Sequence, residues 1–357
     1  MIISKTIKEI LETSVNAPSG GNSQPWRFEV RGDQINVIAE PEKDHPVLNY
    51  RNRGTWIAHG ALIENIKIVA GALGWKTEIK IFPDPTNPNL TAQIRLFEVV
   101  LVENELSKAI LQRTTNRKKY DLKPLTVEQK KYLKQSVEEV GGDVKIILVE
   151  DRNQIIRLGQ TAAANEIVTL ENQKLHNLFF DEMVWTKAEE QKKGRGLFVE
   201  TMELKPPEKL GLKLFKYWPV MKRLVKLGVA RKIAAGNARN YAATPLVGLV
   251  AVRNDDREFI AAGRVIERIW LKTTKLELSF HLITGTMFFW QGINLGGLKL
   301  FSADHQQIIS DEYQAILDIA GLDNRDTNWV VTAMFRVGRG DGPTARSTKK
   351  PPEIKSI

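Results

Sequence analysis

The sequence contains no cysteine, which excludes disulfide bonds, thiolate chemistry, iron–sulfur clusters and zinc sites with cysteine ligands. It also contains no run of about 20 uncharged apolar residues, the length that a membrane-spanning helix requires. The first residues carry charges every few positions, so they lack the apolar block of a signal peptide. We therefore expect a cytoplasmic protein whose chemistry uses groups other than thiols.

Histidine is scarce as well. The five histidines form no H-x-x-x-H or H-E-x-x-H pair, the spacings that indicate a metal site on a helix. His59 and His281 lie in or near apolar helical segments, and we interpret them as packed side chains rather than catalytic bases. The sequence therefore predicts no metal site.

Acidic residues are too few to balance the basic ones, because 42 aspartate and glutamate residues face 52 lysine and arginine residues, a net charge of +10. This charge favours an anionic partner: nucleic acid, a phosphorylated cofactor or a membrane surface. Zinc-finger spacing, RNA-binding aromatic motifs and a clear helix-turn-helix pattern are missing, so nucleic acid is not expected. The phosphate of a small cofactor can use part of the charge.

The length of 357 residues allows one large domain or two coupled ones. Helical and strand patterns are partly segregated, which favours an α+β layout. Residues 1–15 predict a helix, and residues 27–40 predict a hairpin with its turn at Gly32 and Asp33. Further strands are predicted at 91–100, 144–151, 247–253 and 329–338.

The chain also contains a repeat. Residues 56–66 (WIAHGALIENI) and 259–269 (FIAAGRVIERI) are identical at six of eleven positions, and both continue with apolar residues at helical spacing. Small residues such as Gly60 and Gly263 let two helix backbones approach closely, so we expect the two copies to pack on each other. Coincidence between two amphipathic helices is the alternative interpretation.

Two segments are candidates for binding a ligand. Residues 16–30 (NAPSGGNSQPWRFEV) form a loop that can bend tightly and offer amide groups to a flat polar ring, or they are a turn before a core tryptophan. Residues 113–117 (RTTNR) are predicted to begin a helix. Arg113 and Arg117 would then share one helical face near unpaired backbone N–H groups, an arrangement typical of phosphate sites. An exposed basic patch is the competing interpretation.

Together with residues 336–347 (RVGRGDGPTARS), these two segments resemble the FMN-dependent nitroreductase family, and more narrowly its single-chain, internally duplicated branch with mycobacterial members. The resemblance implies an α+β fold of two degenerate copies fused as a pseudo-dimer, with mixed or antiparallel sheets flanked by helices. Residues 1–110 would be the first half and 111–357 the second. The loop occurs only in the first half and R-T-T-N-R only in the second, so one complete site per chain is expected.

The resemblance also implies residue roles. Arg113, Thr115 and Arg346 would bind the FMN phosphate. Arg117 would lie near the N1 and C2 carbonyl edge of the ring, where positive charge favours the reduced flavin. The backbone of Gly285 would face flavin N5. The other expected cofactor-binding residues, which would lie across the ring, are Pro18, Ser19, Asn22 and Gln24.

The function implied is an FMN-dependent oxidoreductase that takes hydride from NAD(P)H and passes it, in ping-pong fashion, to a nitroaromatic, quinone-like or other small planar acceptor. The flavin would carry the chemistry, so no catalytic side chain is required. The rival hypothesis is a non-enzymatic protein that stores FMN beneath a lid. Both a monomer and a dimer are compatible with the duplication.

A lid-like insertion at about residues 180–240 is the largest departure from a minimal nitroreductase. Within it, residues 209–232 combine lysines and arginines with leucines and aromatic residues at helical spacing. Such a segment can cover the flavin, pack into the core or lie on an anionic membrane surface. The sequence leaves these alternatives open.

Overall fold

The computed structural model describes residues 3–357 except 46, 100–104, 298, 324–325 and 327. The α-helices are α1 (Lys5–Ser14), α2 (Arg53–Ala72), α3 (Ser107–Gln112), α4 (Val127–Val140), α5 (Arg152–Glu171), α6 (Gln173–Asp181), α7 (Lys187–Lys193), α8 (Pro206–Phe215), α9 (Trp218–Lys226), α10 (Val229–Tyr241), α11 (Asp256–Lys275), α12 (Gly285–Trp290) and α13 (Ala303–Ala320). The strands are β1 (Trp26–Arg31), β2 (Gln34–Ala39), β3 (Trp75–Ile81), β4 (Leu90–Glu98), β5 (Val144–Val149), β6 (Met183–Val184), β7 (Leu197–Phe198), β8 (Leu246–Arg253), β9 (Ser279–Ile283), β10 (Trp329–Gly338) and β11 (Ile354–Ser356).

Two sheets carry the same topology. The first has the order β11-β1-β2-β4-β3 and the second β5-β8-β10-β9. Apart from β11, both sheets are antiparallel. In each sheet two strands precede the repeated helix in the chain and two follow it, and the second of the following strands lies beside the second of the preceding ones. The predicted α+β fold of two degenerate copies is therefore confirmed.

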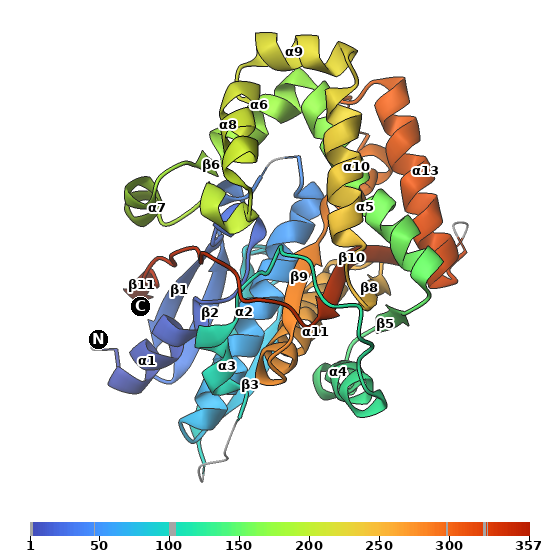
Figure 1. The fold of residues 1–357 in the computed structure, drawn as a ribbon. Helices are drawn as coiled ribbons and strands as arrows, with labels where there is room; N and C mark the ends of the chain where they lie inside the picture. Colours follow the sequence, from blue (N-terminus) through green and yellow to red (C-terminus); the bar gives the residue numbers. More distant parts are fainter. Residues whose placement is uncertain (1–2, 46, 100–104, 298, 324–325, 327) are drawn as a thin grey trace.

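The repeated helices pack directly on each other between the two sheets (Figure 1). A Cβ atom at Gly60 would lie 2.1 Å from the carbonyl oxygen of Ile260, and one at Gly263 would lie 2.0 Å from that of Ile57. These two contacts are equivalent, because each pairs a glycine of one copy with the isoleucine three positions earlier in the other. The predicted close approach is confirmed, and it leaves no room for any side chain at either glycine.

The repeat also contains a glutamate in each copy. Glu64 and Glu267 are both fully buried. Glu64 accepts hydrogen bonds from Arg264 and Arg268 of α11, at 2.9 and 2.7 Å. A buried carboxylate needs a cation or hydrogen-bond donors to offset its lost hydration. Glu64 therefore adds a charged contact to the apolar packing of α2 on α11.

Local sequence accounts for several elements. Ser4 caps α1 by accepting a hydrogen bond from the Ile7 backbone N–H. Gly32, at φ 59°, makes the turn of the predicted hairpin, which is confirmed as β1 and β2. The other predicted strands are confirmed as β4, β5, β8 and β10, although Val100, at the end of the first, lies outside the described residues. His59 is buried in α2 and His281 in β9, as interpreted from the sequence.

The C-terminal tail returns to the first half of the molecule. Strand β11 pairs in parallel with β1, with Phe28 opposite Ile354, so the C-terminus lies beside the first sheet (Figure 1). This crossing carries residues 339–353 over the boundary between the two sheets. Within the described residues, no helix combines the length and the apolar character needed to cross a membrane.

Replacing Gly263 by alanine should destabilise the protein by about 3 kcal/mol or more, because the new methyl group meets the rigid backbone of α2. Gly236 in α10 is the matched control, since its Cβ would have only the end of the Arg239 side chain at 4.0 Å. Gly236→Ala should stabilise α10 by about 0.5–1 kcal/mol. Urea unfolding of both variants checks this, and a Gly263→Ala protein as stable as the wild type would contradict the close packing.

Candidate functional site

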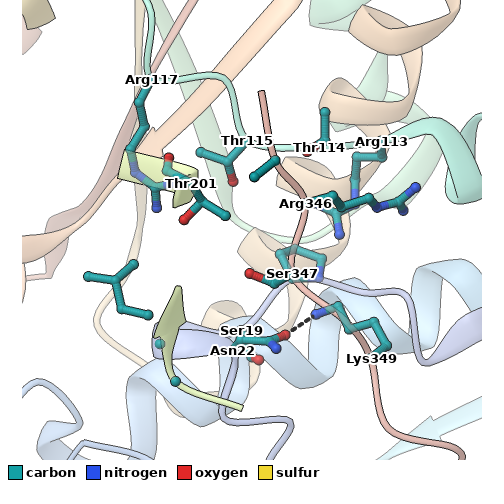
Figure 2. Close-up of a pocket in the computed structure, with 15 residues that line it drawn as sticks. Ser19, Asn22, Arg113, Thr114, Thr115, Arg117, Thr201, Arg346, Ser347 and Lys349 are labelled. Carbon is teal, nitrogen blue, oxygen red and sulfur yellow. Dashed lines mark hydrogen bonds between the residues drawn. The ribbon is translucent and has the colours of Figure 1, made fainter. Parts of the chain in front are cut away.

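A pocket lies where the N-terminal loop, the segment after α3, the insertion and the C-terminal tail meet (Figure 2). About 640 Å³ within it is free of atoms, part of it open to solvent. The lining residues are Pro18, Ser19, Gly21, Asn22, Arg113, Thr114, Thr115, Arg117, Gly196, Leu197, Thr201, Ala345, Arg346, Ser347 and Lys349. The structure thus brings together seven of the nine residues that the sequence analysis proposed.

The N-terminal loop forms one wall. Gly21 and Asn22 have positive φ angles of 54° and 55°, and this left-handed turn reverses the chain before β1. The Ser19 hydroxyl accepts a hydrogen bond from the Gln24 backbone N–H at 3.0 Å. The Gly21 carbonyl accepts one from the Gly196 N–H at 2.8 Å. The loop is therefore held in shape by its own side chains and by the insertion.

The segment at 113–117 does not begin a helix, so that prediction is wrong. Helix α3 ends at Gln112, and Arg113 follows it with φ −54° and ψ 129°. The Asn116 N–H donates to the Phe280 carbonyl at 2.9 Å, which draws the chain into an irregular path beside β9. Tertiary contacts thus override the local helical pattern. Arg113 and Arg117 share no helical face and reach the pocket from different sides (Figure 2).

Arg113 is buried and closely engaged. One guanidinium nitrogen donates to the Asn16 carbonyl at 2.6 Å, Nε lies 3.3 Å from Glu267 Oε1, and the guanidinium sits over the Trp270 ring at 4.3 Å. Burial raises the pKa of Glu267 to about 7, and the Arg113 charge opposes that rise. Arg113 therefore ties the pocket to the second repeated helix.

Arg117 connects the opposite side of the pocket to the insertion. Its guanidinium donates to the Thr201 carbonyl at 2.9 Å, and the Arg117 carbonyl accepts from the Asn240 side chain at 2.9 Å. Burial lowers the pKa of Arg117 from its usual high value. Thr201 lies in a short 3₁₀ helix, η4 (Val199–Met202), so the insertion forms part of the wall.

The C-terminal tail supplies two more cations. Arg346 donates to the Leu111 carbonyl. Lys349, which the sequence analysis missed, donates to the Ala17 carbonyl at 2.8 Å and to the Asn22 side-chain oxygen at 2.7 Å (Figure 2). Burial lowers the pKa of Lys349 well below its usual value; the charges of Arg113 and Arg346 lower it further, and Glu267 opposes them. Arg113, Arg346 and Lys349 thus gather at one end of the pocket, where a bound anion would relieve the repulsion between their charges.

Two proposed residues do not line the pocket. Gln24 is buried behind the loop, where its amide nitrogen donates to the Gly194 carbonyl at 2.7 Å and its oxygen accepts from the Lys350 N–H at 2.8 Å. Gly285 begins α12, and a Cβ there would lie 2.5 Å from the Asn165 side chain, so it packs against α5. Gln24 thus fastens the loop to the insertion and the tail, and Gly285 serves helix packing.

No family model matches the chain. Among curated proteins of Mycobacterium tuberculosis (strain ATCC 25618 / H37Rv), "Putative NAD(P)H nitroreductase Rv3131" is 23% identical over 180 residues, which cover 50% of this chain and 48% of that protein. "Uncharacterized protein Rv3127" is 27% identical over 122 residues, 32% of this chain and 36% of its own. The resemblance to nitroreductases is thus confirmed. The chain matches about half of the length of the first relative and about a third of the length of the second.

Solved structures give a weaker likeness. A BluB-like flavoprotein from Clostridium difficile 630 aligns over 69% of this chain and 95% of its own, with 11% identity and a TM-score of 0.39. This value is too low to decide the fold by itself.

Replacing Arg113 by methionine should lower the free energy of unfolding by about 3 kcal/mol or more above neutral pH, because the buried Glu267 carboxylate loses its cation. The loss should be smaller at about pH 6 than at about pH 8. A carboxyl group whose pKa is raised in the folded protein binds a proton below that pKa and then costs no buried charge. Urea unfolding at both pH values checks this dependence.

Two variants serve as controls. Adding Glu267→Gln to the Arg113→Met protein removes the unpaired charge and should restore much of the stability. Arg346→Met removes an exposed cation and should change stability by less than about 1 kcal/mol. Equal losses in the Arg113 and Arg346 variants would contradict the role given to the buried pair.

Proposed function

We propose that this pocket binds FMN and that the protein is an FMN-dependent oxidoreductase with NAD(P)H as electron donor. The observation that carries the proposal is the pocket itself, in which the loop containing Ser19 and Asn22 faces Arg117 and a cluster of three cations. The loop, the segment after α3 and the C-terminal tail come from parts of the chain more than 90 residues apart. Nitroreductase-like relatives add support through the name of one of them.

The residues present fit the parts of FMN. Arg113, Arg346 and Lys349 supply positive charge for a phosphate dianion, and hydroxyl groups of Thr115 and Ser347 lie in the same lining. The lining thus provides what the anionic end of the cofactor requires.

When bound, FMN would supply hydride transfer through its ring. The chain's own residues would position and tune it: Arg117, half-buried at the far side from the cation cluster, would stabilise negative charge on the ring. Leu197 and Thr201 from the insertion would limit the access of water. Because one pocket would serve both donor and acceptor, they would use it in turn, and the acceptor would be a small planar molecule such as a nitroaromatic compound or quinone.

A second candidate function is storage of FMN without turnover. The observation that favours it is the contact of the insertion with both walls, through the Gly196 N–H on Gly21 and the Thr201 carbonyl on Arg117. If these bonds persist, the insertion would cover the ring and exclude a second molecule. The two functions differ in one respect that can be measured, the access of a reductant to the bound flavin.

The oxidoreductase proposal predicts that purified protein retains FMN and that NADH or NADPH bleaches the flavin absorbance within seconds under anaerobic conditions. Mixing in a stopped-flow spectrometer, followed by addition of a quinone, checks both half-reactions. Bleaching by dithionite but by neither nicotinamide would favour storage. Protein that binds no FMN would contradict both functions.

The pKa of Lys349 predicts how FMN affinity depends on pH. A bound phosphate favours the charged lysine, so binding takes up a proton between the lowered pKa of the free protein and the higher pKa of the complex. Affinity should therefore fall as pH rises from neutrality towards the usual lysine pKa. Lys349→Met should weaken binding roughly 10-fold or more near neutral pH and remove this dependence.

Fluorescence titration with FMN and with riboflavin checks this prediction, because riboflavin has the same ring and no phosphate. The neighbouring Lys350→Met is the matched control and should behave as the wild type, since Lys350 is exposed. The same loss of affinity for riboflavin as for FMN in the Lys349 variant would show that Lys349 does not act on the phosphate.

A further inference from the structure

Exposed apolar side chains gather on helices α8 and α9 and the turns beside them. Of the twelve large apolar residues exposed among the described ones, five lie within residues 210–227. They are Leu210 (63% exposed), Leu214 (54%), Tyr217 (62%), Val220 (36%) and Leu227 (71%). Leu210 and Leu214 are one helical turn apart on α8, so they face one side of that helix. Val220 lies in α9, and Leu227 follows the end of α9 directly. We call these five residues and the basic residues between them the α8–α9 surface.

The segment that contains this surface carries most of the chain's excess positive charge. Residues 205–232 contain nine lysine and arginine residues and one acidic residue, Glu208, a net charge of +8 against +10 for the whole chain. The exposed cations among the apolar residues are Lys213, Lys216, Lys222, Arg223 and Lys226. No ion pair involves these five cations within the described part of the chain. Their charge is therefore available to an external partner.

The helices that carry this surface are anchored on their other side. Leu212 and Phe215 of α8 pack against a buried cluster that includes Phe180, and Met221 of α9 is fully buried against Leu170. The exposed leucines are thus the second face of firmly packed helices. In Figure 1, α9 lies at the extreme top of the molecule, away from both sheets, where a flat partner can reach it.

We propose that the α8–α9 surface docks on the surface of a membrane containing anionic phospholipids. Leucine and tyrosine side chains can enter the boundary between headgroups and acyl chains, while lysines around them contact the phosphates. A second copy of the chain fits poorly, because two surfaces that each carry these five cations would repel each other. A nucleic acid would use the cations but leave the leucines exposed to water.

This docking does not depend on flavin binding, but the two sites are connected. Thr201, in the wall of the pocket, lies five residues before α8 begins. Docking would therefore hold the wall of the pocket close to the lipid, where apolar planar acceptors dissolve.

Co-sedimentation of the full chain with phospholipid vesicles tests the proposal. The wild-type protein should bind vesicles of phosphatidylcholine with phosphatidylglycerol, bind vesicles of phosphatidylcholine alone far less, and be released by high salt. Absence of binding to the anionic vesicles would overturn the proposal. Equal binding to both kinds of vesicle would overturn the role of the charge.

Variants identify the surface. Lys213→Glu, Lys216→Glu and Lys222→Glu together should lower the partition coefficient by about 100-fold or more. The matched control makes the same change of net charge elsewhere, at exposed lysines near and within α4: Lys123→Glu, Lys131→Glu and Lys134→Glu. It should bind nearly as the wild type does, and an equal loss in both triple variants would contradict docking through α8 and α9.

A second pair of variants distinguishes the entry of apolar side chains into the lipid from electrostatic attraction alone. Replacing Leu210, Leu214 and Leu227 by serine should weaken binding about tenfold or more, whereas Leu122→Ser with Val127→Ser, also exposed, should not. Sedimentation velocity without vesicles tests whether a second copy of the chain covers this surface instead. A wild-type dimer that the three serines convert to a monomer would overturn the proposal in favour of self-association.

Discussion

Two helix backbones in contact, α2 and α11, hold the rest of this molecule in place. Gly60 and Gly263 allow each helix to rest on a carbonyl group of the other, and a methyl group at either position would overlap that carbonyl. Because the interior of a protein is packed as densely as a crystal, such a contact fixes the distance between the two sheets within narrow limits. The pocket depends on this distance, since its walls are attached to both halves.

The duplication has also diverged in a way that explains where the pocket forms. Glu64 and Glu267 occupy equivalent positions of the repeat and are equally buried, but they meet different cations. Arginines of α11 itself neutralise Glu64, which closes that side of the helix pair. Glu267 instead faces Arg113, from a loop that lines the pocket. One copy of the glutamate thus strengthens the helix contact, and the other orients a pocket residue.

Local patterns in the sequence were sufficient for much of the fold. A run of mostly apolar residues predicted β10 with the observed bounds, and the turn residue Gly32 predicted the first hairpin. The repeat predicted the central helix contact because glycine at a helix interface has a direct steric meaning. Seven of the site residues that the family resemblance implied meet in one pocket, and all seven lie in loops or in the C-terminal tail.

The sequence predictions that were wrong or incomplete all concern residues whose positions are set by contacts with distant parts of the chain. The segment at 113–117 follows a helix instead of starting one, since its path is set by β9 and by the buried Glu267. Lys349 was missed because it lies in a tail without regular structure that returns to the first sheet through β11, and nothing in its neighbours indicates that crossing. Gln24 and Gly285 were assigned from the family resemblance alone, and Thr284-Gly285 does not reproduce the family's Glu-Gly pair. In the structure the Gln24 side chain bonds to the insertion and the tail, and Gly285 packs against α5.

We propose that the two halves of the chain together form a single cofactor pocket. A crystal structure of the protein with FMN tests this most directly. We expect the phosphate to lie against Arg346 and Lys349, the ring to lie towards Arg117, and Ser19 or Asn22 to contact the same molecule. FMN bound elsewhere, or touching residues of only one half, would contradict it.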